Sequence, residues 1–88
     1  MQIESAWTYK LNMILSKEHL KYDKHTNYVE DLDKRSIFGS VYIAQVHRRW
    51  RKIVITILED HSYYGSKFQA LDNEIEQTLK RPVTLRLA

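Results

Sequence analysis

Two short runs rich in β-branched residues constrain the fold of this chain more than any other feature. Val41–Val46 and Ile53–Leu58 have compositions typical of strands, and six residues separate them. We therefore expect a hairpin. The connecting segment His47–Lys52 carries three arginines, a lysine and Trp50, so the hairpin would hold a cationic, aromatic tip on a stiff ribbon.

The opening segment fits two periodicities. Apolar side chains occupy six of the seven odd positions of Ile3–Leu15, and this period of two predicts a strand with one buried face. A helical stripe through Leu11 and Ile14 also fits. That stripe leaves Tyr9 and Met13 outside it, so we favour the strand.

The polar segment from Lys17 to Arg35 is open to more than one interpretation. Asn27 suits a helix N-cap and Glu30 stands at the capping-box position, which indicates a short helix beginning near Asn27. An irregular loop or an additional strand is the alternative.

The last third of the chain has clearer signals. Ser66–Gln69 has the pattern of a helical capping box, and an apolar stripe with helical spacing follows it as far as Leu79. Pro82 ends the helix because the residue before a proline disfavours helical geometry. Alternation in Val83–Leu87 predicts a final short strand.

Residues 1–88 are expected to form a single small α+β domain. The element order predicts a ferredoxin-like β-(α)-β-β-α-β sandwich, in which one clear C-terminal helix packs on one face of an antiparallel sheet. Both alternating faces of Ile53–Leu58 are apolar, so the sheet face without a helix needs a cover. We expect a second copy to supply it, which predicts a homodimer; the alternative is a loop, with the polar segment Lys17–Arg35 folded over the sheet.

Charge is distributed unevenly along the chain, whose formal net charge is +3. Lys34–Lys52 contains six basic residues and no acidic one, whereas Glu59–Glu76 contains five acidic residues and a single lysine. The molecule should therefore be polarised, with a basic hairpin and an acidic helix face.

The basic stretch and its tryptophan are the candidate contacts with a nucleic acid or an acidic protein surface. They are His47, Arg48, Arg49, Trp50, Arg51, Lys52, Lys34 and Arg35. Arginine and lysine neutralise phosphates, and tryptophan stacks on bases. Tyr22, Tyr28 and Tyr63 are candidate interface residues because tyrosine buries a large area at low entropic cost. The alternative is a solvated tip whose Trp50 folds back onto the sheet.

Several classes of site lack their sequence signals. The chain has no cysteine, which excludes disulfides, thiolate metal sites and cysteine nucleophiles. Its four histidines lack metal-ligand spacing, and it has no glycine-rich phosphate loop. We expect no catalytic residue, metal or cofactor, and therefore a non-enzymatic protein.

The leading expectation is a small, basic, nucleic-acid-binding module in the cytoplasm. No signal peptide and no apolar run of membrane-spanning length is present, so we expect no membrane partner. The corresponding run Lys52–Ile57 lacks the aromatic and glycine residues of RNA-recognition domains. The alternative function is a protein–protein interaction module, such as a small inhibitor or adaptor encoded by a phage or another mobile element.

Overall fold

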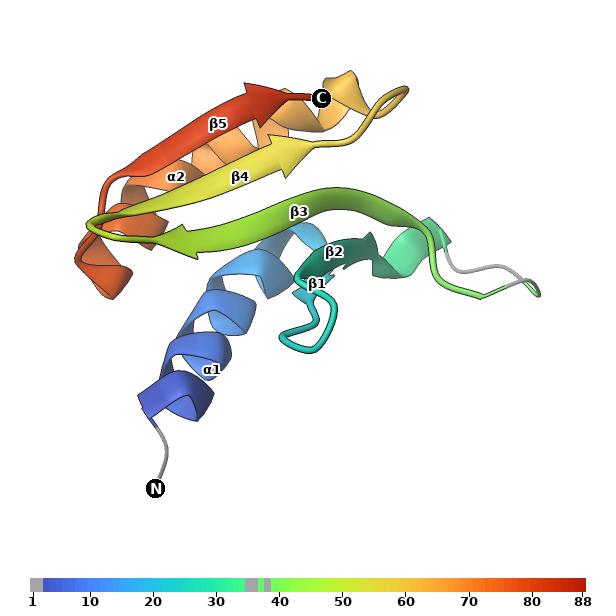
Figure 1. The fold of residues 1–88 in the computed structure, drawn as a ribbon. Helices are drawn as coiled ribbons and strands as arrows, with labels where there is room; N and C mark the ends of the chain where they lie inside the picture. Colours follow the sequence, from blue (N-terminus) through green and yellow to red (C-terminus); the bar gives the residue numbers. More distant parts are fainter. Residues whose placement is uncertain (1–2, 35–36, 38) are drawn as a thin grey trace.

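A five-stranded sheet forms one layer of the protein and two α-helices form the other (Figure 1). The structure, a computed structural model, describes residues 3–34, 37 and 39–88. Its elements are α1 (Ile3–Leu15), η1 (Ser16–Glu18), β1 (Leu20–Tyr22), β2 (Tyr28–Asp31), η2 (Leu32–Lys34), β3 (Tyr42–Arg49), β4 (Lys52–Ile57), η3 (Ser62–Tyr64), α2 (Gly65–Leu79) and β5 (Val83–Leu87).

The sheet is mixed, with strand order β1-β2-β3-β4-β5. The first four strands are antiparallel neighbours, whereas β5 pairs parallel with β4. A parallel neighbour requires a crossover connection, and α2 provides it. The predicted α+β class is confirmed. The ferredoxin-like order is not the one observed, because the chain begins with a helix and the sheet is not wholly antiparallel.

The strand predicted for the first fifteen residues is wrong, because Ile3–Leu15 forms helix α1. Leu11 and Leu15 are fully buried, whereas Tyr9 is 66% and Met13 55% exposed. These two outward-facing apolar side chains stand at odd positions and imitate the alternation of a strand. Packing of α1 against β1 and α2 selects the helix.

Residues 20–31 form an extra hairpin, so the short helix expected near Asn27 is also wrong. Strands β1 and β2 flank a turn in which Asn27 has a φ of 67°, a left-handed conformation that asparagine tolerates. The Asn27 carbonyl accepts a hydrogen bond of 2.8 Å from the Val46 amide. The described residues that directly follow β2 form a single 3₁₀ turn, η2.

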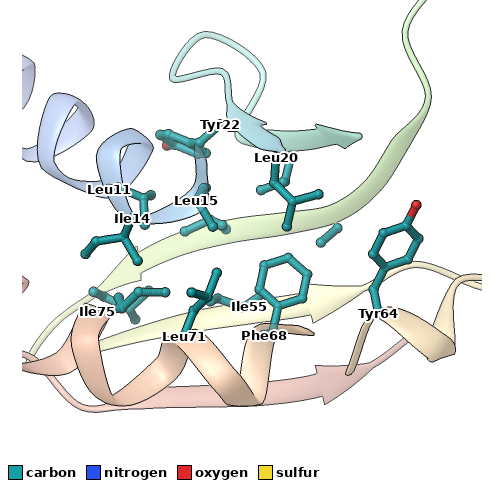
Figure 2. Packing of buried hydrophobic residues seen from close by; sticks show 14 of the residues in the cluster. Leu11, Ile14, Leu15, Leu20, Tyr22, Ile55, Tyr64, Phe68, Leu71 and Ile75 are labelled. Carbon is teal, nitrogen blue, oxygen red and sulfur yellow. The ribbon is translucent and has the colours of Figure 1, made fainter. Parts of the chain in front are cut away.

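The hydrophobic core lies between the two helices and one face of the sheet. In Figure 2, Leu11 of α1 and Phe68 of α2 extend into this layer, which also contains Ile55 of β4. All three side chains are fully buried. The helical stripe predicted in the last third of the chain is confirmed, since Phe68, Leu71, Ile75 and Leu79 are the buried residues of α2.

The start of α2 differs from the predicted capping box. The helix begins at Gly65, and no side chain caps its N-terminus. Ser66 lies inside the first turn, where its hydroxyl donates a hydrogen bond of 3.4 Å to the Tyr63 carbonyl.

The predicted final strand is confirmed as β5. Among the described residues, neither helix is long and apolar enough to cross a membrane.

The sheet face away from the helices, called here the open face, is largely polar. In β4 it carries Lys52, Val54 and Thr56, because Ile53, Ile55 and Ile57 point into the core. Val54 is 5% exposed, so its neighbours already cover it. The reason given for a homodimer, an uncovered apolar face, does not hold. Light scattering against the monomer mass of 10.6 kDa tests whether another surface self-associates.

The outer edge of β1 is protected by a side chain of α1. The Oδ1 atom of Asn12 accepts a hydrogen bond of 2.7 Å from the Tyr22 amide, and its Nδ2 atom donates one of 3.1 Å to the Tyr22 carbonyl. Asn12 thereby satisfies both backbone groups as a neighbouring strand would. This pairing anchors α1 to the edge of the sheet.

We expect Asn12→Ala to lower the free energy of unfolding by about 1–2 kcal/mol, because two partly buried backbone groups lose their partner. Urea unfolding measures the change. Asn73→Ala is the matched control, since Asn73 lies on the exposed face of α2 and alanine favours a helix. Equal effects of the two substitutions would contradict the edge-capping role.

Candidate functional site

The β3–β4 hairpin ends in a two-residue turn that exposes the predicted basic tip. Arg49 pairs with Lys52, and Trp50 and Arg51 form the turn between them. Trp50 is 84% exposed and does not fold back onto the sheet. The Arg51 guanidinium lies 5.7 Å from the centre of the Trp50 ring, so a cation and an aromatic face are offered side by side.

Arg51 occupies a turn position that usually belongs to glycine. Its φ of 67° lies in the left-handed region, which costs a residue with a Cβ roughly 1–2 kcal/mol. Arginine at this position places a positive charge at the end of the hairpin, although its backbone must adopt this strained conformation. Strain of this kind is often found at functional positions.

The basic side chains of the hairpin point to both faces of the sheet. Arg49 and Lys52 lie opposite each other on the open face and are exposed. Arg48 points toward the helix layer, where its guanidinium lies 5.4 Å from the centre of the Trp7 ring. His47 is half-buried on the open face, opposite Val54.

Two basic residues that were not predicted as contacts lie beside the hairpin. Lys80 and Arg81 follow α2, and Nη1 of Arg81 donates a hydrogen bond of 2.7 Å to the Arg49 carbonyl. Figure 1 shows the α2–β5 connection next to the β3–β4 turn. We call this set of cations the basic end; it comprises Arg48, Arg49, Arg51, Lys52, Lys80 and Arg81.

A hollow between α1 and the β1–β2 turn continues the basic end. Its lining includes Arg48, Lys24 and His25, together with the ring of Trp7. None of its lining residues is acidic. Cationic side chains from three separate parts of the chain therefore gather at the same end of the molecule.

Lys34 was predicted to act with the hairpin but does not belong to the basic end. It lies in η2 at the opposite end of the sheet, and its Nζ donates a hydrogen bond to the Tyr63 hydroxyl. The same Nζ atom is 4.7 Å from the centre of the Tyr63 ring. Arg35, the other predicted contact in this segment, lies outside the described residues.

The three candidate interface tyrosines have different surroundings. Tyr22 is only 6% exposed, packs edge-on against Trp7 and donates a hydrogen bond to Asn27, so it is not an exposed contact residue. Tyr28 is half-buried on the open face, and Tyr63 is 55% exposed.

A polar cluster lies at the end of the sheet opposite the basic end. The buried Asp31 carboxyl accepts hydrogen bonds from the Tyr64 hydroxyl and from the Asp33 amide, the latter at 2.9 Å. Burial, followed by the bond to Asp31, raises the pKa of Tyr64 above its usual range. The hydrogen bond from Lys34 lowers the pKa of Tyr63 and raises that of Lys34.

The raised pKa of Tyr64 predicts a loss of stability at alkaline pH. The unfolded chain releases this proton near pH 10 while the folded chain retains it, so the stabilisation present below pH 10 declines above it. Above pH 10, we expect the free energy of unfolding to decrease by up to about 1.4 kcal/mol for each pH unit because of this hydroxyl. Urea unfolding of the natural chain and Tyr64→Phe at pH 8, 10 and 11 measures the slope. Parallel slopes in the two proteins would contradict the prediction.

The described residues contain no group of three or more histidines, aspartates or glutamates that could hold a metal ion. Comparison of the chain with protein-family models, curated proteins and solved structures finds no significant match. The candidate site is therefore defined by geometry alone. Trp50 is exposed beside Arg51, and further cations of β3, β4 and the end of α2 lie at the same end of the molecule.

Proposed function

We propose that this protein is a non-enzymatic module that binds nucleic acid through its basic end, without a cofactor. The observation that carries the proposal is the exposure of Trp50 beside Arg51 at the tip of a paired hairpin. Exposed cations neutralise phosphates and an exposed indole stacks on a base, which together make up a general nucleic-acid contact.

The position of Lys80 and Arg81 supports the same function. They add two charges beside the hairpin although about thirty residues of sequence separate them from it. Glu76, the nearest acidic residue of α2, is engaged by a hydrogen bond of 2.8 Å from the Val83 amide. Glu76 keeps its negative charge in this bond, but the six cations of the basic end outnumber it, and a net positive charge favours a polyanionic partner.

Fluorescence anisotropy of a labelled ten-nucleotide single strand and a matched duplex tests the proposal. We expect binding by the natural chain, and a loss of roughly fivefold or more in affinity for the single strand on Trp50→Ala, because a stacking contact is removed. Trp50 is exposed, so the melting temperature should not change. Absence of binding to both nucleic acids would contradict the function.

A protein partner with an acidic surface is the second candidate, and the exposure of Trp50 favours it as well, since tryptophan is enriched at binding hot spots. The two candidates respond differently to salt. An interface anchored by Trp50 should persist at 0.5 M salt, whereas phosphate contacts weaken steeply. Salt-resistant binding of an acidic protein, without binding of nucleic acid, would select the second candidate.

A further inference from the structure

We infer that the open face of the sheet binds a single-stranded nucleic acid, with phosphates along its basic side chains and bases on a pair of tyrosines. This inference rests on the proposed function and extends it, because it selects a single strand over a duplex. It uses residues of all five strands of the sheet.

The charge of the open face favours a polyanion. The strand residues on this face include five basic or titratable side chains: Lys21, His47, Arg49, Lys52 and Arg86. The five strands are fully described, and Glu30 is the only acidic strand residue on this face. Val54 is an apolar residue of this face, but it is buried, so it adds no exposed apolar surface that a protein partner could cover.

Two tyrosines of the open face form a platform for bases. Tyr28 of β2 stands opposite Gln45, and Tyr42 of β3 stands opposite Glu30, after a bulge that brings both rings to the same face. Their ring centres are 5.4 Å apart at an angle of 41°, and Tyr42 is 42% exposed. Aromatic rings presented in this way stack on unpaired bases of any sequence, whereas paired bases in a duplex are not accessible to them.

The tyrosine pair and the basic end lie at different positions along one surface. Strand β3 runs from Tyr42 to Arg49, which at about 3.3 Å per residue is roughly 25 Å. Gln45 and His47 stand between them on the same face. A single strand that contacts Trp50 at the tip can therefore continue along β3 and reach the tyrosines.

The experiment compares a labelled ten-nucleotide oligothymidylate with a ten-base-pair duplex and with inorganic polyphosphate. The double variant Tyr28→Leu/Tyr42→Leu removes the platform, and Tyr9→Leu is the matched control, because Tyr9 is 66% exposed on α1. We expect the double variant to bind the single strand at least about fivefold more weakly. Its affinity for the duplex and for polyphosphate should not change, and Tyr9→Leu should behave as the natural chain.

Arg86→Gln is an independent variant of the same face that keeps both tyrosines. Arg86 is exposed on β5, opposite Thr56, so its loss should leave folding intact. We expect the slope of log affinity against log salt for the single strand to become less negative by about 0.7.

Unchanged single-strand affinity in the tyrosine variant, together with an unchanged salt slope in Arg86→Gln, would overturn the inference. Nucleic-acid binding by the hairpin would still stand in that case. Absence of binding to every nucleic acid by the natural chain would instead overturn the proposed function and this inference together.

Discussion

Phe68→Ala should remove a large part of the free energy of unfolding and lower the melting temperature more than any surface substitution. Phe68 is fully buried between the helices and the sheet, and removing a buried phenylalanine side chain costs about 3–5 kcal/mol. A chain of 88 residues has a total stability of roughly 4–13 kcal/mol. The substitution therefore removes a large part of it, and the melting temperature should fall by roughly 15–30 °C.

Thermal unfolding followed by circular dichroism measures this loss. Gln69→Ala is the matched control, because Gln69 is the next residue of α2 and is exposed. The control should melt within about 2–4 °C of the natural chain, since surface substitutions change stability by about 0.5 kcal/mol. Similar melting temperatures for all three proteins would show that the packing in Figure 2 is not the core of the protein.

The double variant Arg49→Gln/Lys52→Gln should bind nucleic acid roughly 100-fold more weakly than the natural chain. The two side chains lie side by side on the open face and are exposed. Each contact between a charged side chain and a phosphate contributes about 1.5 kcal/mol or more, so losing two of them costs about two orders of magnitude. The Arg81 bond to the Arg49 carbonyl remains, because it uses the backbone.

A charge-matched control separates the position of the charge from its amount. The variant Lys17→Gln/Lys67→Gln also removes two positive charges, one from η1 and one from α2. Lys17 pairs with Glu74 at 2.6 Å, and Lys67 pairs with Glu18 at 4.0 Å. Surface pairs of this kind contribute little to stability. Anisotropy titrations should show a much smaller effect in the control. Equal losses in the two variants would indicate attraction by net charge alone.

The parts of the fold that the sequence predicted have local signals. The β3–β4 hairpin follows from two β-branched runs of clear composition, and α2 follows from an apolar stripe that ends before Pro82. Helix α1 carries apolar residues with both helical and strand spacing, so tertiary packing decides its structure. Strands β1 and β2 have three and four residues, and their pairing depends on neighbours distant in the sequence.

In the candidate site as well, the parts with local signals were predictable and the parts that depend on distant pairing were not. The exposed hairpin tip was predictable because its charges and Trp50 are contiguous in the sequence. Lys80 and Arg81 were missed because the parallel pairing of β5 with β4, which returns the end of α2 to the hairpin, has no local signal. Tyr28 alone was predicted as an interface residue, and its contact with Tyr42 was missed because a bulge in the β2–β3 pairing, which has no local signal, brings the two rings together.

The salt dependence of nucleic-acid affinity, measured for the natural chain and for Arg49→Gln/Lys52→Gln, tests the central claim most directly. If these two side chains contact phosphates, log affinity should fall linearly with log salt in the natural chain. The slope for a single strand should then be less negative by about 1.4 in the variant. Affinity of the natural chain that does not depend on salt, or identical slopes in the two proteins, would contradict binding through the basic end.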